Sequence, residues 1–257
     1  MQQGTIDWSA AWLAPWRTVG EAVAAQLHAG LPLHEALNAV RGDTEAIPHF
    51  VAPDALAPGE SYERYIFNSK QCPVHDGYHD FFNGICWLQF PQTKSRLNAL
   101  HAQALQATQG SDATQDPKAA RGPVRDALTV FDENAAFLMA PPEVADQLWP
   151  ALLSRNWWRL FVDLRPLWQQ VQPLLFGHAL LEKLLAPRKP ITAHVFIASC
   201  AITSIAQLDA HIASQLHAET LARKPFAPLP VLGIPGWHAE NENPAFYNDP
   251  KVFRVAP

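Results

Sequence analysis

The chain has 257 residues, a formal net charge of −5 and 48% hydrophobic residues. This length fits one or two domains and can bury a core without a metal or a disulfide to stabilise it. An acidic balance without a basic stripe argues against nucleic-acid binding. The uncharged stretch around Val195 to Leu208 contains Ser, Thr and Gln, so it lacks the roughly 20 predominantly apolar residues of a membrane span. We therefore expect neither nucleic-acid nor membrane partners.

The cysteines and the amino-terminal residues indicate the cellular compartment in which the protein is expected. The three cysteines (Cys72, Cys86 and Cys200) are widely spaced and form no CxxC pair, so neither a disulfide framework nor a zinc ribbon is expected. The first residues lack the basic region and apolar run of a secretory signal. We expect a cytoplasmic protein.

The first half of the chain predicts helices around one proline-rich loop. Gly30 and Pro32 suit the end of one helix and the start of the next. Residues 41–60 are typical of a loop, and 62–67 of a short strand. The helix that begins at Asp76 or Gly77 is apolar nearly all round, which is typical of burial. The helices expected here are 16–29, 33–40, 76–90 and 93–108.

The second half predicts a mixture of strands and short helices. Two apolar runs flank Asp132-Glu133-Asn134, a pattern typical of a β-hairpin near 127–139. Prolines 150, 166 and 173 divide the following segment into short helical pieces. The later elements expected are a loop at 109–120, a helix at 174–185, a strand at 191–197 and a helix at 204–222 with a capping box.

The carboxyl-terminal residues, from Pro225 onward, contain seven prolines and five aromatic residues. Because disordered tails are poor in aromatic residues, we expect an extended segment packed on the body. The whole pattern predicts an α+β, predominantly helical fold with one hairpin and short further strands. We expect a single globular domain over 1–257.

One candidate site gathers His79, Asp80, Asn83 and His101 on two apolar helices. A His-Asp doublet can supply a nitrogen and an oxygen ligand to a metal ion. Alternatively, Asp80 favours the helix amino terminus by its charge, and His79 and Asn83, one turn apart, bond each other or a loop. The structural alternative is the more economical one.

A second candidate site is His178 with Glu182, four residues apart on one helix face. Imidazole beside carboxylate suits a general base, a metal ligand or a group that orients one. The alternative is a structural ion pair, because a buried carboxylate is costly unless it is paired.

Arg121 and Arg125 form a third candidate set. Two guanidinium groups at this spacing can hold a carboxylate or phosphate bidentately. They can equally neutralise neighbouring acids such as Asp126 or Asp132. His194, alone in a predicted strand, is most simply a core residue.

Several long segments resemble a bacterial family known as domain of unknown function 3025. The matching segments are HDFFNGICWLQFPQTKSRLNALH (79–101), RGPVRDALTVFDEN (121–134), LFGHALLEKLLAP (175–187), ITAH (191–194), PLPVLGIPGW (228–237) and FYNDPKVFR (246–254). They span most of the chain. The resemblance implies a full-length single-domain family of bacterial proteins, and it brings no activity.

These candidates lead to two functional hypotheses. The first is a small-molecule enzyme, a metal-dependent hydrolase of a phosphorylated substrate. Its catalytic residues would be His79, Asp80, His178 and Glu182, its metal ligands His79, Asp80, His101 and His178, and its ligand-binding residues Asn83, Arg121 and Arg125. The alternative is a non-catalytic binding or assembly protein whose buried polar residues are structural. The enzyme requires the first two candidate sites to meet, and no oligomeric state is predicted.

Overall fold

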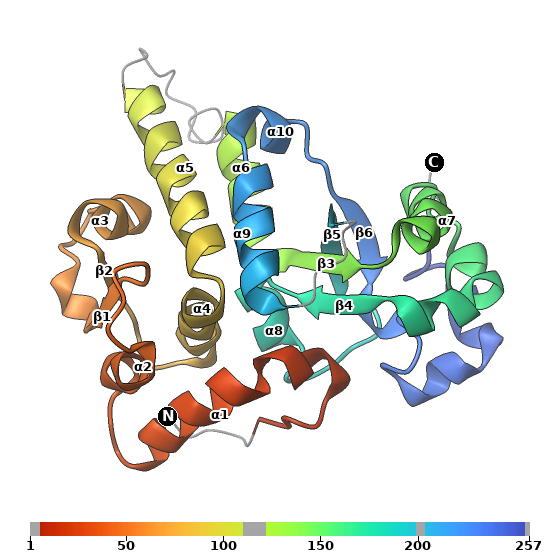
Figure 1. The fold of residues 1–257 in the computed structure, drawn as a ribbon, viewed down its shortest axis with the longest axis horizontal. Helices are drawn as coiled ribbons and strands as arrows, with labels where there is room; N and C mark the ends of the chain where they lie inside the picture. Colours follow the sequence, from red (N-terminus) through yellow and green to blue (C-terminus); the bar gives the residue numbers. More distant parts are fainter. Residues whose placement is uncertain (1–5, 110–121, 199–203, 255–257) are drawn as a thin grey trace. The chain divides into compact units, whose positions relative to one another are not determined.

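A computed structural model describes residues 6–109, 122–198 and 204–254, and the chain divides into two compact units. Unit 1 contains residues 16–132 and 203–224, with 1–3. Unit 2 contains residues 4–15, 133–202 and 225–257. The α+β, predominantly helical fold is confirmed (Figure 1). The single domain stays a prediction, and each unit is described by itself.

Unit 1 is built mainly from helices (Figure 1). Strands β1 (His49–Val51) and β2 (Gln71–Pro73) pair in parallel as a small separate sheet. Helices α5 and α9 lie side by side. The helices of the unit are α1 (Arg17–His28), α2 (Leu33–Arg41), α3 (Tyr62–Ser69), α4 (Tyr78–Gln89), α5 (Pro91–Gln109), α6 (Gly122–Asn134, whose last two residues belong to unit 2), α9 (Ile205–Gln215) and α10 (Ala218–Ala222).

Helix α4 occupies the core of unit 1, and every residue from Phe81 to Trp87 is buried. Gly84 explains how it packs so closely against α2. A Cβ atom at this position would lie 2.5 Å from Leu37 Cδ1, so any larger residue would force the Leu37 side chain or one of the two helices to shift. The glycine that is unfavourable for a helix in isolation is therefore needed for packing.

Unit 2 is built around a four-stranded sheet with the strand order β4-β3-β5-β6 (Figure 1). Strand β3 (Ala135–Met139) pairs antiparallel with β4 (Gln172–Leu175) and parallel with β5 (Thr192–Ala198). Strand β6 (Ala227–Pro230) pairs antiparallel with β5. The helical elements of this unit are α7 (Pro142–Leu153), α8 (His178–Lys183), the π-helix η3 (Arg159–Asp163) and the 3-10 helices η1 (Ala11–Trp16, whose last residue belongs to unit 1), η4 (Arg165–Gln170), η5 (Val231–Gly233), η6 (Ala239–Glu242) and η7 (Pro244–Asn248).

The carboxyl-terminal segment contributes aromatic residues to the core of unit 2. The Phe161 ring stacks on Tyr247 with centroids 5.1 Å apart, and Phe253 meets the same ring edge-on. Trp157 Nε1 donates a hydrogen bond to the carbonyl oxygen of Arg254 (2.7 Å). These contacts attach residues 246–254 to the remainder of the unit.

Two predicted strands are wrong. Residues 127–134 belong to helix α6, so there is no hairpin at 127–139. The buried residues Ala127, Leu128 and Phe131 lie at helical spacing, and the partners of β3 are distant in sequence. Residues 62–67 likewise belong to helix α3 rather than a strand. In both places the helical period decided the structure, despite a β-tolerant composition.

Other boundaries differ less. The helix expected over 174–185 begins only at His178, because Leu174 and Leu175 pair in β4. The helix expected over 204–222 is two helices. Its predicted cap is confirmed, since Ser204 Oγ accepts a hydrogen bond from the Gln207 backbone N–H (3.2 Å). Most of the predicted loop at 109–120 lies outside the described residues. Among the helices of the described residues, none is long and apolar enough to cross a membrane.

Candidate functional site

A buried lysine lies at the centre of a polar network in unit 1. Lys94, on α5, is only 4% exposed. Its Nζ donates to Asp132 Oδ1 (2.5 Å) and to Asn83 Oδ1 (2.8 Å), and lies 5.5 Å from the centre of the Trp87 ring. Removing a cation from water is costly unless it is paired, so Asp132 stabilises Lys94 in its buried position.

The network continues from Asn83 towards a buried thiol. Asn83 Nδ2 donates to the Tyr62 hydroxyl (3.1 Å), which lies 3.2 Å from Cys72 Sγ. Burial raises the pKa of the Tyr62 hydroxyl, and raises the pKa of the Cys72 thiol to about 12. The thiolate is the reactive form of cysteine, so Cys72 is an inert thiol at neutral pH.

His101 lies further along α5 and is 8% exposed. Burial lowers the pKa of its imidazole, while the charges of Asp132 and Glu63 oppose that shift. The ring is therefore neutral at physiological pH. Of the first candidate set, Asn83 and His101 are buried as predicted.

His79 and Asp80 occupy a different environment from Asn83. The side chain of His79 is exposed, although its helix is apolar nearly all round. Asp80 lies in the first turn of α4 and accepts a hydrogen bond from the His75 backbone N–H (2.6 Å). Its position at a helix amino terminus fits the structural alternative.

The second candidate set lies in unit 2, whereas the first lies in unit 1. His178 is buried at the first turn of α8, and Glu182 is half-buried one turn later. Among the described residues, no three His, Cys, Asp or Glu side chains are grouped to hold a metal ion. The predicted catalytic and metal sets stay predictions, because they draw on both units.

The two predicted anion-binding arginines have different outcomes. Arg121 lies outside the described residues. Arg125 lies in the first half of α6 and lines a cavity of unit 1. Its side chain makes no hydrogen bond or ion pair with any described residue.

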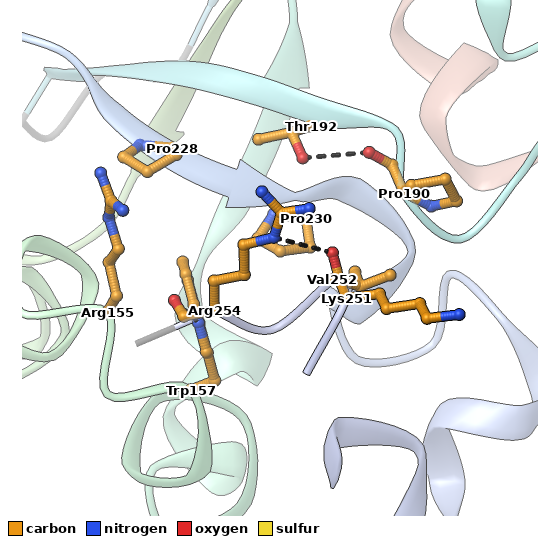
Figure 2. Close-up of a pocket in the computed structure, with 9 residues that line it drawn as sticks. All are labelled: Arg155, Trp157, Pro190, Thr192, Pro228, Pro230, Lys251, Val252 and Arg254. Atoms are coloured by element: carbon orange, nitrogen blue, oxygen red, sulfur yellow. Dashed lines mark hydrogen bonds between the residues drawn. The ribbon is translucent and has the colours of Figure 1, made fainter. Parts of the chain in front are cut away.

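Unit 2 contains a cationic pocket that no pattern in the sequence indicated (Figure 2). Its volume is about 310 Å³. None of the nine described residues that line it is acidic. The lining consists of Arg155, Trp157, Pro190, Thr192, Pro228, Pro230, Lys251, Val252 and Arg254.

The two arginines extend towards the same strand, as Figure 2 shows. The guanidinium group of Arg155 reaches towards Pro228, and that of Arg254 towards Pro230, while the Lys251 side chain runs away from both. Arg254 Nε donates to the Lys251 carbonyl oxygen (3.1 Å), which anchors the guanidinium group at its Nε side. Planar guanidinium groups suit carboxylate and phosphate oxygens.

The cations of this pocket lack carboxylate partners among the described residues. The acid nearest in sequence to Lys251 and Arg254 is Asp249, whose Oδ2 lies 3.3 Å from Lys189 Nζ. A hydrogen bond from the Lys251 backbone N–H, together with Lys189, lowers the pKa of Asp249. That acid is therefore ionised and already paired, so the guanidinium groups of Arg155 and Arg254 remain available to an anion from solution.

Arg155 has an unfavourable backbone conformation for a residue with a side chain. It follows helix α7 with φ +52°, in the left-handed region where glycine is preferred. The Arg155 N–H donates to the Leu152 carbonyl and the Asn156 N–H to the Ala151 carbonyl, which is the Schellman pattern. Lys70 and Lys224 also follow helices in this conformation, and neither lines the pocket. Of these three residues with a left-handed backbone conformation, Arg155 is the one that lines the pocket.

No local signal could have revealed the pocket, since its walls come from four separated segments. Thr192 and Pro230 are directly paired on β5 and β6, whereas Arg155 follows α7 and Arg254 lies near the carboxyl-terminal end of the described chain. Two of the segments that resemble the family, 228–237 and 246–254, contain five of the lining residues.

The comparisons with known proteins give one match. A family model described as "Protein of unknown function (DUF3025)" matches residues 48–256. This range includes parts of both units and every lining residue of the pocket, and it confirms the resemblance found in the sequence. No curated protein and no solved structure matches the chain.

Proposed function

The chain belongs to the DUF3025 family of proteins of unknown function, and we propose that it binds a small phosphorylated or carboxylated molecule in the cationic pocket of unit 2. The observation that carries this proposal is the pair of guanidinium groups, Arg155 and Arg254, around a cavity without an acid in its lining. A volume of about 310 Å³ falls in the range of small-molecule sites.

The walls of the pocket support an organic anion. Trp157, Val252 and three prolines supply apolar surface beside the cations. The Thr192 hydroxyl, which donates to the Pro190 carbonyl (3.2 Å), retains lone pairs for a donor on the ligand. A ligand with a charged end and a compact apolar body would use all of these groups.

Binding is better supported than catalysis. None of the predicted catalytic residues, His79, Asp80, His178 or Glu182, is in the lining, and Thr192 is its one hydroxyl side chain. A hydrolase of a phosphorylated compound would need these residues to act together with the pocket, so hydrolysis stays a prediction. A cytoplasmic location in a bacterium also stays part of the proposal, and fractionation of cells would test it.

The test is calorimetric titration of the full chain with inorganic phosphate and pyrophosphate. Each hydrogen bond to a charged group contributes about 1.5–3 kcal/mol, so we expect Arg155→Ala/Arg254→Ala to weaken pyrophosphate binding at least 100-fold. Lys70→Ala/Lys224→Ala removes the same charge outside the pocket and should bind like the wild type. Equal affinity in both double variants would refute the proposal.

A further inference from the structure

Unit 1 contains a second cavity with a different chemistry. Its lining residues belong to α5, α6 and α10, and its volume is about 350 Å³. Its lining is mainly apolar and of small side chains, including Leu100, Ala104, Val124 and Ala218. The cationic pocket of unit 2 has two guanidinium groups at its wall, whereas this cavity has one.

Among the described residues of the lining, Arg125 is the one that carries a charge. Its guanidinium group has no hydrogen bond or ion pair with the described part of the chain. Its charge adds to the burial that lowers the pKa of His101 on α5, and Arg125 shares the lining with Leu100 and Ala104 of that helix. The polar residue Gln103 also lines the cavity. One cation beside an apolar cavity is complementary to one anionic group on an apolar body.

We propose that this cavity is a binding site for an aliphatic carboxylate, whose charged end pairs with Arg125 and whose hydrocarbon chain lies against α5 and α6. A carboxylate matches a single guanidinium bidentately. The small side chains of Ala104 and Ala107 leave room for a slender chain, and a bulkier ring system would contact them sooner. This site is separate from the proposed function, which concerns unit 2.

The chain length of the ligand gives the first test. Burial of one methylene group corresponds to about a three- to fourfold gain in affinity. Calorimetric titration of the full chain with hexanoate, octanoate and decanoate should therefore give affinities that increase by about tenfold for each two carbons. Absence of saturable octanoate binding, or equal affinity for all three acids, would overturn the proposal.

Variants locate the ligand. Arg125→Met should weaken octanoate binding at least tenfold and leave octanol binding unchanged, whereas Arg17→Met, an exposed change in the same unit, should alter neither. Ala104→Leu or Ala107→Leu should fill the cavity and abolish binding of both ligands, with the midpoint of thermal unfolding as the check on folding. Octanoate binding as tight in Arg125→Met as in the wild type would overturn the proposal.

The two binding proposals fail separately. Arg155→Ala/Arg254→Ala should reduce pyrophosphate binding and leave octanoate binding unchanged, and Arg125→Met should do the reverse. If octanoate binding were lost in Arg155→Ala/Arg254→Ala instead, the acid would occupy the cationic pocket and the assignment to unit 1 would be wrong. Pyrophosphate binding without octanoate binding would leave only the function proposed for unit 2.

Discussion

The two units place their cations in opposite surroundings. In unit 1, Lys94 is buried and bound to Asp132 and Asn83. In unit 2, Arg155 and Arg254 line an open pocket, with no acid in its lining. A buried pair satisfies its own charge and leaves nothing for a ligand. A cation that reaches a cavity without a carboxylate partner is available to bind an anion, so pairing, rather than burial or charge alone, distinguishes a structural cation from a binding one.

The largest expected effect comes from breaking the buried pair. Asp132→Ala leaves Lys94 buried without its acid, and such changes cost about 3–5 kcal/mol. Because the Asp132 side chain is 24% exposed, water can partly replace it, so we expect a loss of about 3 kcal/mol in the free energy of unfolding. Urea denaturation measures this loss.

The double variant Lys94→Met/Asp132→Leu removes both charges and should recover a large part of that stability. The matched control is Lys70→Met, because Lys70 is exposed and should change the free energy of unfolding by less than about 0.5 kcal/mol. A loss in Asp132→Ala as small as that of the control would mean that the pair does not stabilise unit 1.

A smaller effect is expected at Arg155. Glycine avoids the steric cost of the left-handed conformation, so Arg155→Gly should keep or raise the free energy of unfolding, by up to about 1 kcal/mol. The same substitution should weaken pyrophosphate binding about tenfold. Lys70→Gly and Lys224→Gly make the same backbone change and should leave binding intact. Unchanged binding in Arg155→Gly would show that the pocket does not need this cation.

The smallest effect concerns pH. The pKa of folded His101 is lowered by burial, so the unfolded chain binds the proton more tightly. The stability contributed by the neutral ring is fully present above about pH 6.5, the pKa of His101 in the unfolded chain. It is lost as the pH falls towards the lower pKa of His101 in the folded chain, by at most about 1.4 kcal/mol per pH unit. Urea midpoints at pH 7.5 and 5.5 should therefore differ less in His101→Gln than in the wild type. His28→Gln, an exposed change, should keep the wild-type difference.

The sequence predicted the fold class, most helices of unit 1 and the cap at Ser204, because these depend on local periodicity and capping. It failed at 127–134, where Leu128, Thr129, Val130 and Phe131 tolerate either structure and packing selected the helix. It identified Asn83 and His101 as inward polar residues, yet it missed Lys94 as their neighbour. It also missed the pocket of unit 2, since Arg155 and Arg254 are almost 100 residues apart and come together only in the folded chain.

Segments of the two units alternate along the chain, and this alternation has a consequence for how the gene is inherited. After residues 4–15 in unit 2, the chain forms most of unit 1, returns to unit 2 at 133, contributes 203–224 to unit 1 and ends in unit 2. Neither unit is therefore a contiguous stretch of gene. A recombination event that transfers one contiguous stretch of gene therefore cannot move one unit without also moving fragments of the other unit. The units are expected to pass together from ancestor to descendant, and the family match, which includes parts of both, is consistent with such joint descent.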